Sequence, residues 1–511
     1  MIRWLCVFGV FGIMMTANAG NINTESVYQD ILNDPEAVYF TPQNFSITAD
    51  GRTDVSDELQ KAIDLIKTEK NFGILFIPAG KYRISKTIYI PKAVRLIGYG
   101  RERPLIFLAE NSPGYQKPVE SDKGRANYMF WFTSGTVDEG ESPRDAGAGT
   151  FYSAISNINL KINDGNPHAV ALRTHFAQHS FVENMVIDAG NGKAGLYDVG
   201  NEMDNVAFYG GEYGIYTTKT SPSWPMMMID TYFEGQRKAA IFSQEGGLVI
   251  MRMHARNVPA VIEIREKYSD RIFMEDCRLE QVSGPALIIS NENNYTNQIS
   301  LRNVDCRDVP ILAYYRRSGK ESRGTGEIYK IRNYTHGIHM DSMTDDPAAD
   351  TRADLLPLDT LPAFASRDIP RLPATEDWVN LRELGAVGDG KTDNTKIFQD
   401  ALEQTVEAIP GRPVYISDEY DARMVRMDVK EEGTLSNLQH FAEQGEFGSA
   451  VDEKGNLYVA NGQIYVYNPD GDRIGVIKVP ERPAAIQFGG KDKDILFITA
   501  RSSLYGVRIP K

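Results

Sequence analysis

A short motif recurs along the middle of the chain, and its spacing restricts the possible folds more than any other feature. An asparagine or aspartate introduces a short apolar alternation at seven places, which are Asn157, Asn184, Asn205, Asp230, Asp276, Asn303 and Asn333. The successive steps are 27, 21, 25, 46, 27 and 30 residues. The step of 46 is twice 23, so one repeat between Asp230 and Asp276 lacks the motif.

Steps of this length are typical of coils of three short strands, each coil stacking on the next. Asparagine and aspartate tolerate the left-handed backbone that bends require, and their side chains can hydrogen-bond along a stack. We therefore predict an all-β fold with a parallel β-helix over residues 40–340. An antiparallel sandwich is the alternative, and it favours turns about every 8–12 residues.

A second repeat joins two distant parts of the chain. Residues 49–54 (ADGRTD) recur as residues 388–393 (GDGKTD), and residues 59–63 (LQKAI) align at the same offset of 339 with residues 398–402. In each copy an Asp-Gly turn and a capping aspartate precede an amphipathic pattern, which predicts a helix.

The first of these copies belongs to a segment, about residues 42–100, with three further stretches: LQKAI, FIPAGKY and LIGYG. In this order and spacing the segment resembles the N-terminal module of the pectate lyase superfamily, also called rhamnogalacturonase/epimerase-like or family 28-related. ISNINLKI, FVENMVID and MDNVAFYGGEYGIYT are similar to the first β-helix of family 55 β-1,3-glucanases. The resemblance implies a right-handed β-helix whose open end is capped by an N-terminal helix, and an activity on carbohydrate.

The C-terminal part resembles a different family. AVDEKGNLYVA, IYVYNPDGDRIG, VPERPAAIQFGG and LFITARSSLY are similar to the end of a gluconolactonase/regucalcin (senescence marker protein-like) propeller. About 100 residues remain for it, which is two to three blades at roughly 40 residues each. The family's metal-binding Asp-Gly corresponds to Phe447-Gly448 here, with Glu446 as the nearest carboxylate.

These features predict five segments. They are a signal peptide (1–19), a pectate-lyase-like β-helix (40–340), a Pro-rich acidic linker (341–376), a truncated second module (377–413) and partial propeller blades (414–511). The signal peptide is indicated by Arg3, by the apolar run Trp4–Met15 and by Ala17-Asn18-Ala19. A secreted or periplasmic location follows from it, and an uncleaved anchor is the alternative.

The net charge limits the possible binding partners, and the cysteine spacing bears on a possible disulfide. The net charge of −14 disfavours nucleic acid and anionic membrane surfaces, and it also weighs against a polyanionic substrate such as pectate unless calcium or a local basic groove intervenes. A polysaccharide or oligosaccharide is the partner that the resemblance implies, and the oligomeric state stays open. Cys277 and Cys306 are 29 residues apart, close to one coil. Either a disulfide or two buried thiols is compatible with that spacing.

Candidate site residues cluster between Asp188 and Glu245. A glycosidase needs two carboxylates across the scissile bond, and aromatic rings stack on sugars. We predict Glu234 as the acid, with Asp230 or Asp204 as its partner, and no metal, although calcium is possible. The predicted sugar-binding residues are Tyr209, Tyr213, Trp224 and Tyr232. The alternative interpretation is that acids occupy turns and aromatics fill the core.

Three functions other than hydrolysis remain open at this point. A non-catalytic carbohydrate-binding or adhesion protein would keep the β-helix without the chemistry. A polysaccharide lyase would need cations on one face of the stack, and five arginines with no regular spacing supply them: Arg252, Arg256, Arg265, Arg271 and Arg278. A lactonase-like metal enzyme would need the ligands of the propeller family. His254 is one of four histidines that could join any such site.

Overall fold

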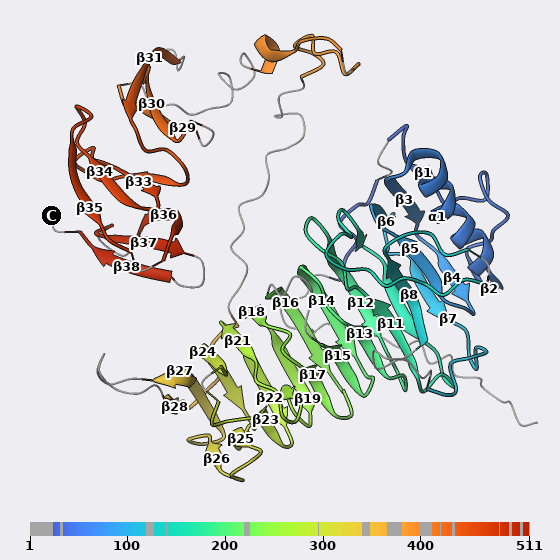
Figure 1. Ribbon diagram of the computed structural model, residues 1–511. Helices are drawn as coiled ribbons and strands as arrows, with labels where there is room; N and C mark the ends of the chain where they lie inside the picture. The colour runs from blue at the N-terminus through green and yellow to red at the C-terminus, as the bar shows by residue number, and fades with distance from the viewer. Residues whose placement is uncertain are drawn as a thin grey trace, which may run out of the picture. The chain divides into compact units, whose positions relative to one another are not determined.

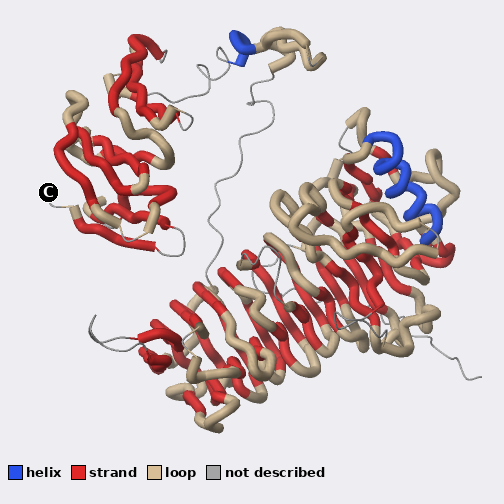
Figure 2. Tube along the Cα trace, in the orientation of Figure 1, coloured by secondary structure: helices blue, strands red, loops and turns tan. Residues whose placement is uncertain are grey.

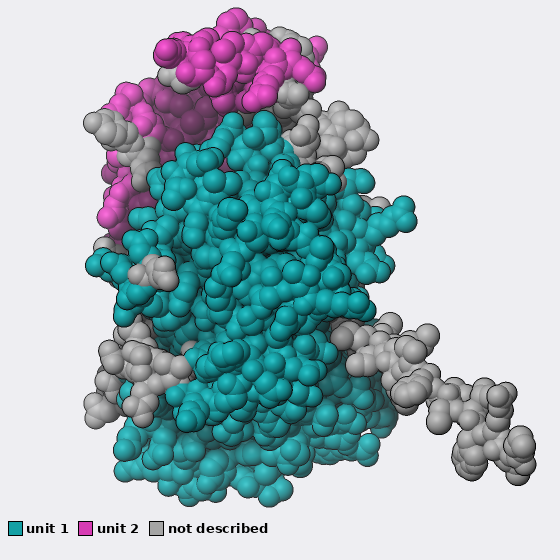
Figure 3. Space-filling view, turned by 90° about the vertical axis from the view of Figure 1, so that its right-hand side faces the viewer, with its two compact units in different colours: residues 1–368 teal, residues 369–511 magenta. Residues whose placement is uncertain are grey.

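The structure is a computed structural model of the 511-residue chain. It describes residues 24–30, 34–118, 127–138, 140–218, 225–294, 296–339, 348–364, 381–389, 391–398, 411–418, 421–431, 435–479, 481–489, 493–500 and 504–509. The predicted signal peptide and Trp224 lie outside these residues. The chain divides into two compact units, residues 1–368 and 369–511, which Figure 3 colours separately.

Two long sheets form the first unit (Figure 1). The larger one has 18 strands: β1 (Val38–Tyr39), β2 (Asp50–Asp54), β3 (Gly73–Pro78), β4 (Lys81–Ile84), β6 (Val94–Tyr99), β7 (Leu105–Leu108), β9 (Ala154–Ser156), β10 (Asn159–Ile162), β12 (Phe181–Asp188), β14 (Glu202–Tyr209), β16 (Met226–Glu234), β18 (Leu248–Met251), β19 (His254–Val258), β21 (Arg271–Glu275), β22 (Arg278–Val282), β24 (Gln298–Arg307), β27 (Ile328–His339) and β28 (Ala348–Pro357). The smaller one has ten: β5 (Ile88–Pro91), β8 (Asn127–Thr133), β11 (Ala169–Arg173), β13 (Ala194–Tyr197), β15 (Tyr213–Thr217), β17 (Ala239–Ser243), β20 (Ile262–Ile264), β23 (Pro285–Ile289), β25 (Ile311–Tyr315) and β26 (Glu321–Arg323).

Neighbouring strands in both sheets run parallel and come from successive coils. β14 pairs with β12 on one side and β16 on the other, and β15 lies between β13 and β17. The predicted right-handed parallel β-helix is confirmed, and strands make up most of it (Figure 2). It ends in antiparallel pairs, β24 with β27 and β27 with β28.

The recurring Asn/Asp motif marks a bend in the larger sheet. Seven residues with φ between 49° and 57° occupy this bend, and we call them the ladder: Asn157, Asn184, Asn205, Asp230, Arg252, Asp276 and Asn303. The repeat that lacked the motif is therefore filled by Arg252, 22 residues after Asp230 and 24 before Asp276. Asn333 was wrongly included, because it lies opposite Arg302 in the antiparallel strand β27.

Side chains hydrogen-bond along the ladder. Asn205 Nδ2 donates to Asn184 Oδ1 at 2.8 Å, and Asn303 Nδ2 donates to Asp276 Oδ1 at 2.5 Å. Arg252 replaces the amide by a guanidinium, whose Nε and Nη2 donate to the two Asp230 oxygens at 2.7 and 3.2 Å. Asp230 is only 3% exposed, so this ion pair holds a carboxylate that is almost entirely buried in the bend.

We expect Arg252→Ala to lower the free energy of unfolding by about 2–3 kcal/mol, since it leaves a buried carboxylate without its cation. Urea denaturation of the full chain measures this. The control combines Asp230→Asn with Arg252→Asn, which copies the Asn184–Asn205 pair, and it should recover most of the loss. A single variant as stable as the parent would show that Asp230 does not need Arg252.

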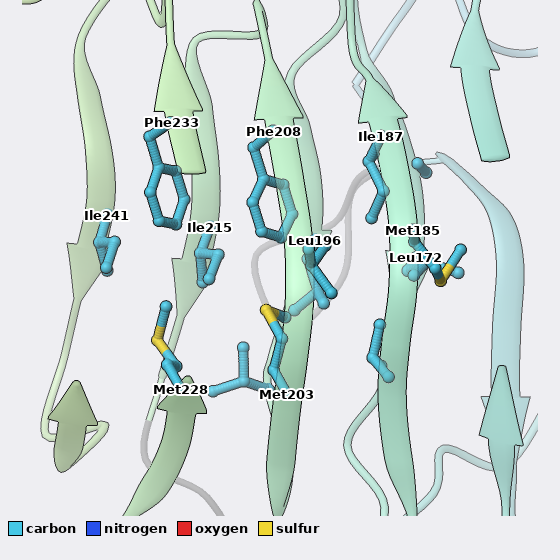
Figure 4. Packing of buried hydrophobic residues seen from close by; sticks show 14 of the residues in the cluster. Leu172, Met185, Ile187, Leu196, Met203, Phe208, Ile215, Met228, Phe233 and Ile241 are labelled. Atoms are coloured by element: carbon cyan, nitrogen blue, oxygen red, sulfur yellow. The ribbon is translucent and has the colours of Figure 1, made fainter. Parts of the chain in front are cut away.

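Apolar side chains of successive coils stack inside the β-helix (Figure 4). Phe208 and Phe233 are register neighbours whose rings lie parallel, with centroids 4.9 Å apart and planes at 6°. Figure 4 shows side chains such as Ile215 approaching this stack from the smaller sheet. Each coil thus buries its apolar alternation against the next coil, which explains why alternation follows every ladder residue.

The N-terminal end is covered by α1 (Ser56–Lys70), as the resemblance implied, with Leu59, Ala62, Ile63 and Ile66 buried. The Asp-Gly turn that precedes α1 is the motif of residues 49–54 that recurs at residues 388–393. Asp50 Oδ1 accepts from the amides of Arg52 and Thr53, and Asp389 Oδ1 accepts from those of Lys391 and Thr392.

Near the end of the β-helix, the structure changes the predicted bounds of the linker and distinguishes between the two alternatives for the cysteines. Residues 348–357, expected in the linker, form β28 and extend the larger sheet. Cys277 and Cys306 are buried, unlinked thiols. Cys306 aligns with Leu279 rather than Cys277, so the two side chains are offset along the strands.

The second unit has three small antiparallel sheets, consistent with a partial propeller-like segment. They contain β29 (Val414–Asp418), β30 (Arg423–Val429) and β31 (Leu435–Ala442); β32 (Ser449–Val451), β33 (Leu457–Asn461), β34 (Gln463–Tyr467) and β35 (Arg473–Ile477); and β36 (Pro483–Gly489), β37 (Ile495–Ala500) and β38 (Leu504–Arg508). Among the residues described, no helix has both the length and the apolar composition for a membrane crossing.

Candidate functional site

The larger sheet carries two rows of side chains on its outer face beyond the bend. Strand alternation turns the second and fourth residue after each ladder position away from the core. The +2 row contains Asn159, Val186, Ala207, Tyr232, His254, Arg278 and Asp305. The +4 row contains Lys161, Asp188, Tyr209, Glu234, Arg256, Glu280 and Arg307. Acids, cations, a histidine and tyrosines thus share one face.

Glu234 lies at the centre of the +4 row. The Tyr232 hydroxyl donates to Glu234 Oε2 at 2.8 Å, and the Tyr232 and Tyr209 rings are 5.7 Å apart. Burial raises the pKa of Tyr209, and the charges of Glu234 and Asp188 raise it further. Tyr209 therefore lies between two carboxylates that both act on its hydroxyl.

Asp188 is the second carboxylate of this group. Its neighbours are the Lys161 ammonium at 3.6 Å and the backbone amide of Gly190, which donates to Oδ1 at 3.0 Å. Asp188 and Glu234 are separated by one intervening strand, so their Cα atoms are about 10 Å apart. In inverting glycosidases the two carboxyl groups are about 6.5–9.5 Å apart, which leaves room for a water.

A charged cluster continues the rows toward the C-terminal end of the β-helix. His254 Nε2 lies 3.4 Å from Glu280 Oε1, and Arg307 forms an ion pair with the same carboxylate. The contacts with His254 and Arg307 lower the pKa of Glu280 to about 2, although burial opposes the shift. Among the described residues, neither ring nitrogen of buried His254 has a hydrogen-bond partner.

The segment that follows β28 covers part of this cluster. The Phe364 ring lies 5.7 Å from the His254 ring and 5.0 Å from the Arg278 guanidinium, and Arg278 Nη2 donates to the Pro362 carbonyl at 2.6 Å. An aromatic ring can therefore pack on His254 and Arg278, which is the contact that the apolar face of a sugar would make.

The structure brings together only some of the predicted site residues. Glu234, Tyr209 and Tyr232 lie side by side. Asp230 belongs to the ladder, where it is buried and bound to Arg252, so the structure offers no support for a catalytic partner there. Asp204 precedes the ladder residue Asn205 and lies on the other side of the bend from Glu234.

Tyr213 is separated from the other predicted sugar-binding residues. It belongs to β15 of the smaller sheet, where its ring packs against Tyr216 and Phe242. Trp224, as stated above, falls outside the described residues.

Sequence reasoning missed Asp188, Arg256 and Arg278 as members of one site. The arginines had no regular spacing when compared with each other. Counted from the ladder they are regular, because Arg256 follows Arg252 by four residues and Arg278 follows Asp276 by two. The spacing of Arg252 from Asp230 and Asp276 is the sequence signal that could have placed these arginines in the rows.

A family model described as rhamnogalacturonase A/epimerase, pectate lyase-like, matches residues 41–305. This covers more than half of the chain, and it spans α1, the ladder and both rows except Arg307. The chain belongs to this family. A second model, described as an SMP-30/gluconolactonase/LRE-like region, matches residues 410–502 of this pectate lyase-like chain.

Solved structures resemble parts of the pectate lyase-like chain. A luciferin-regenerating enzyme is 22% identical, covering 17% of this chain and 34% of its own, with a TM-score of 0.16. Regucalcin from Agrobacterium tumefaciens, titled a calcium-binding protein, is 24% identical, with coverages of 18% and 35% and a TM-score of 0.17. The chain thus spans about a third of the length of these two proteins. The catalytic unit of an α-1,3-glucanase from Streptomyces thermodiastaticus is 13% identical, with coverages of 58% and 68% and a TM-score of 0.33. A comparison with curated proteins found no match.

Within the described residues, no group of three or more histidine, cysteine, aspartate or glutamate side chains could hold a metal ion. Glu446, the carboxylate nearest to the expected ligand position of the propeller family, forms an ion pair with Arg482. The carboxylate nearest to the expected ligand position thus already has a cationic partner.

Proposed function

We propose that this protein is an exported, polysaccharide-active glycoside hydrolase whose site is the outer face formed by the +2 and +4 rows. The observation that carries the proposal is the placement of Asp188 and Glu234 on either side of Tyr209. A pair of carboxyl groups flanking the scissile bond is what most glycoside hydrolases use.

The surroundings of the two acids suggest their roles. Asp188 contacts a lysine and a backbone amide, which are partners suited to a carboxylate base. Glu234 is the register neighbour of Tyr209 and accepts from the Tyr232 hydroxyl, and among the described residues no cation lies within ion-pair distance of it. Glu234 gives its proton to the glycosidic oxygen as the bond to the anomeric carbon breaks. Asp188 takes a proton from the attacking water, which inverts the anomeric configuration.

The cationic residues favour an acidic polymer. Arg256, the register neighbour of Glu234, provides positive charge beside the proposed acid in a chain whose net charge is −14. Guanidinium groups bind carboxylates through paired hydrogen bonds. Of the two substrate types considered, a pectin-type polymer therefore suits this face better than a neutral β-1,3-glucan.

A glycan screen on the full chain tests this function. We expect release of reducing ends from a pectin-type polymer, without the ultraviolet absorbance of an unsaturated uronide. Unsaturated products would replace hydrolysis by a lyase reaction. Retention of glycan without turnover would instead support the binding or adhesion function. Calcium- or zinc-dependent opening of a lactone would support a lactonase.

Export is a separate part of the proposal. The predicted signal peptide supports a secreted or periplasmic location, with cleavage after Ala19. N-terminal sequencing of the protein expressed with its leader should begin at Gly20, and retention of Met1 in a membrane fraction would contradict it.

A further inference from the structure

A cavity of about 700 Å³ lies at the N-terminal end of the β-helix. Its walls come from the end of α1, the start of β3, the turn before β6, and the loop that precedes β9. This is several coils from β16, which carries Glu234 (Figure 1). A volume in this range suits a small ligand.

Three aromatic side chains of this cavity are exposed to an unusual degree. Phe72 is 69% exposed, Tyr152 50% and Phe151 38%. Tyr152 has a left-handed backbone, with φ of 58°, which is uncommon for a bulky residue. Its ring stacks on His179 at 5.1 Å with the planes at 10°, so the ring is held in a fixed position. Exposed aromatic surface gathered in a concave site indicates a bound partner.

The cavity is positively charged within an acidic protein. Its charged lining residues are four cations, Lys67, Lys70, Lys92 and Arg95, against two acids, Asp34 and Glu36, which gives +2. Glu36 is already paired with Lys70. Burial lowers the pKa of Lys67, and the charge of Lys92 lowers it further. A bound anion would relieve this repulsion between the two lysines.

We propose that the cavity is a separate binding site for an acidic saccharide, with Lys92 and Arg95 binding a sugar carboxylate and the Tyr152 ring stacking on the pyranose. Both elements are needed, because rings alone would accept neutral sugars and cations alone would accept any small anion. The concave shape favours a saccharide over a membrane surface, where apolar side chains must protrude. The site holds one end of a polymer or oligomer independently of cleavage.

Isothermal titration of the full chain with digalacturonate tests the proposal. The dimethyl ester of the same disaccharide is the matched ligand, since it has the same rings without the charge. We expect the acid to bind about tenfold more tightly than the ester, and Lys92→Gln to remove about tenfold in affinity. Tyr152→Asn, which tolerates the left-handed backbone, should weaken both ligands. Lys320→Gln, on an exposed turn at the other end of the β-helix, is the control and should change nothing.

The relative affinities of the two ligands and of the variants determine whether the cavity is the binding site. Equal affinity for acid and ester, or unchanged binding in both Lys92→Gln and Tyr152→Asn, would overturn it. So would the absence of digalacturonate binding together with retention on phosphatidylglycerol vesicles. Binding that survives Glu234→Gln supports it, because the cavity is then distinct from the proposed catalytic face. That result would hold even if the protein cleaved no glycan.

Discussion

Replacing Arg173 with methionine is expected to lower the free energy of unfolding by about 3–5 kcal/mol. The Arg173 side chain is 2% exposed, and its guanidinium lies 2.6 Å from Asp145 and 3.0 Å from Asp198, whose side chains are 9% and 6% exposed. The rings of Tyr128 and Tyr197 lie over it at 5.3 and 5.2 Å. Methionine keeps much of the packing but leaves two buried carboxylates close together. Urea denaturation of the full chain measures the loss.

The loss should depend on pH in a defined direction. Burial raises the pKa of Asp145, but hydrogen bonds from His175 and Arg173 and the charge of Arg173 lower it well below its ordinary value. In the parent, the lowered pKa of Asp145 stabilises the folded state. This stabilisation is fully present above the unfolded-state pKa of about 3.9 and is lost as the pH falls below it. In Arg173→Met the pKa of Asp145 should be raised instead. The difference between the two proteins should therefore shrink as the pH falls from neutral toward about 4.

The control for this prediction adds Asp145→Asn and Asp198→Asn to Arg173→Met. Neutral amides need no cation, so the triple variant should be more stable at neutral pH than Arg173→Met alone. A single variant that unfolds at the same urea concentration as the parent at every pH would contradict the burial of this ion-pair cluster.

Glu234→Gln is expected to reduce glycan cleavage by about 10²–10⁴-fold while leaving glycan affinity nearly unchanged. The amide keeps the shape of the side chain and its contact with Tyr232, but it cannot give up a proton. Initial rates of reducing-end release, measured beside equilibrium binding of the same polymer, separate the two effects. Loss of binding in proportion to activity would show that Glu234 only holds the substrate.

Two matched variants identify the partner of Glu234. Asp188→Asn should cause a loss of comparable size, because Asp188 is the carboxylate on the far side of Tyr209. Asp204→Asn should leave the rate within about twofold, since its side chain lies across the bend. The reverse order of the two effects would restore Asp204 as the partner and remove Asp188.

The β-helix could be predicted from the chain because its constraint is local and repeated. Each coil needs a residue that tolerates left-handed backbone at the bend, and Asn or Asp supplies it at six of the seven ladder positions. Arg252 was not recognised as a ladder residue, because its role depends on the carboxylate of Asp230 in the preceding coil. Nothing in its own neighbourhood marks it, and only the contact with Asp230 explains why an arginine is accepted there.

The site was predicted less completely for the same reason. Glu234, Tyr209 and Tyr232 share a short stretch of chain, and composition alone placed them together. Asp188 and Glu234 are 46 residues apart in sequence. They share one face because β12 pairs with β14 and β14 pairs with β16, and the register of these two pairings aligns both residues with Tyr209. Asp230 was predicted as the partner of Glu234 because it is close in sequence, but it occupies a ladder position, where its carboxylate binds Arg252.

The position of a bound oligosaccharide tests the central claim most directly. A crystal structure of Glu234→Gln, soaked with an oligosaccharide that the parent protein cleaves, should show a sugar unit over Tyr209 with its glycosidic oxygen beside position 234. A water close to Asp188 on the opposite side of the anomeric carbon is expected in the same structure. A productive oligosaccharide lying instead along the smaller sheet, beside Tyr213 and Tyr216, would contradict the account.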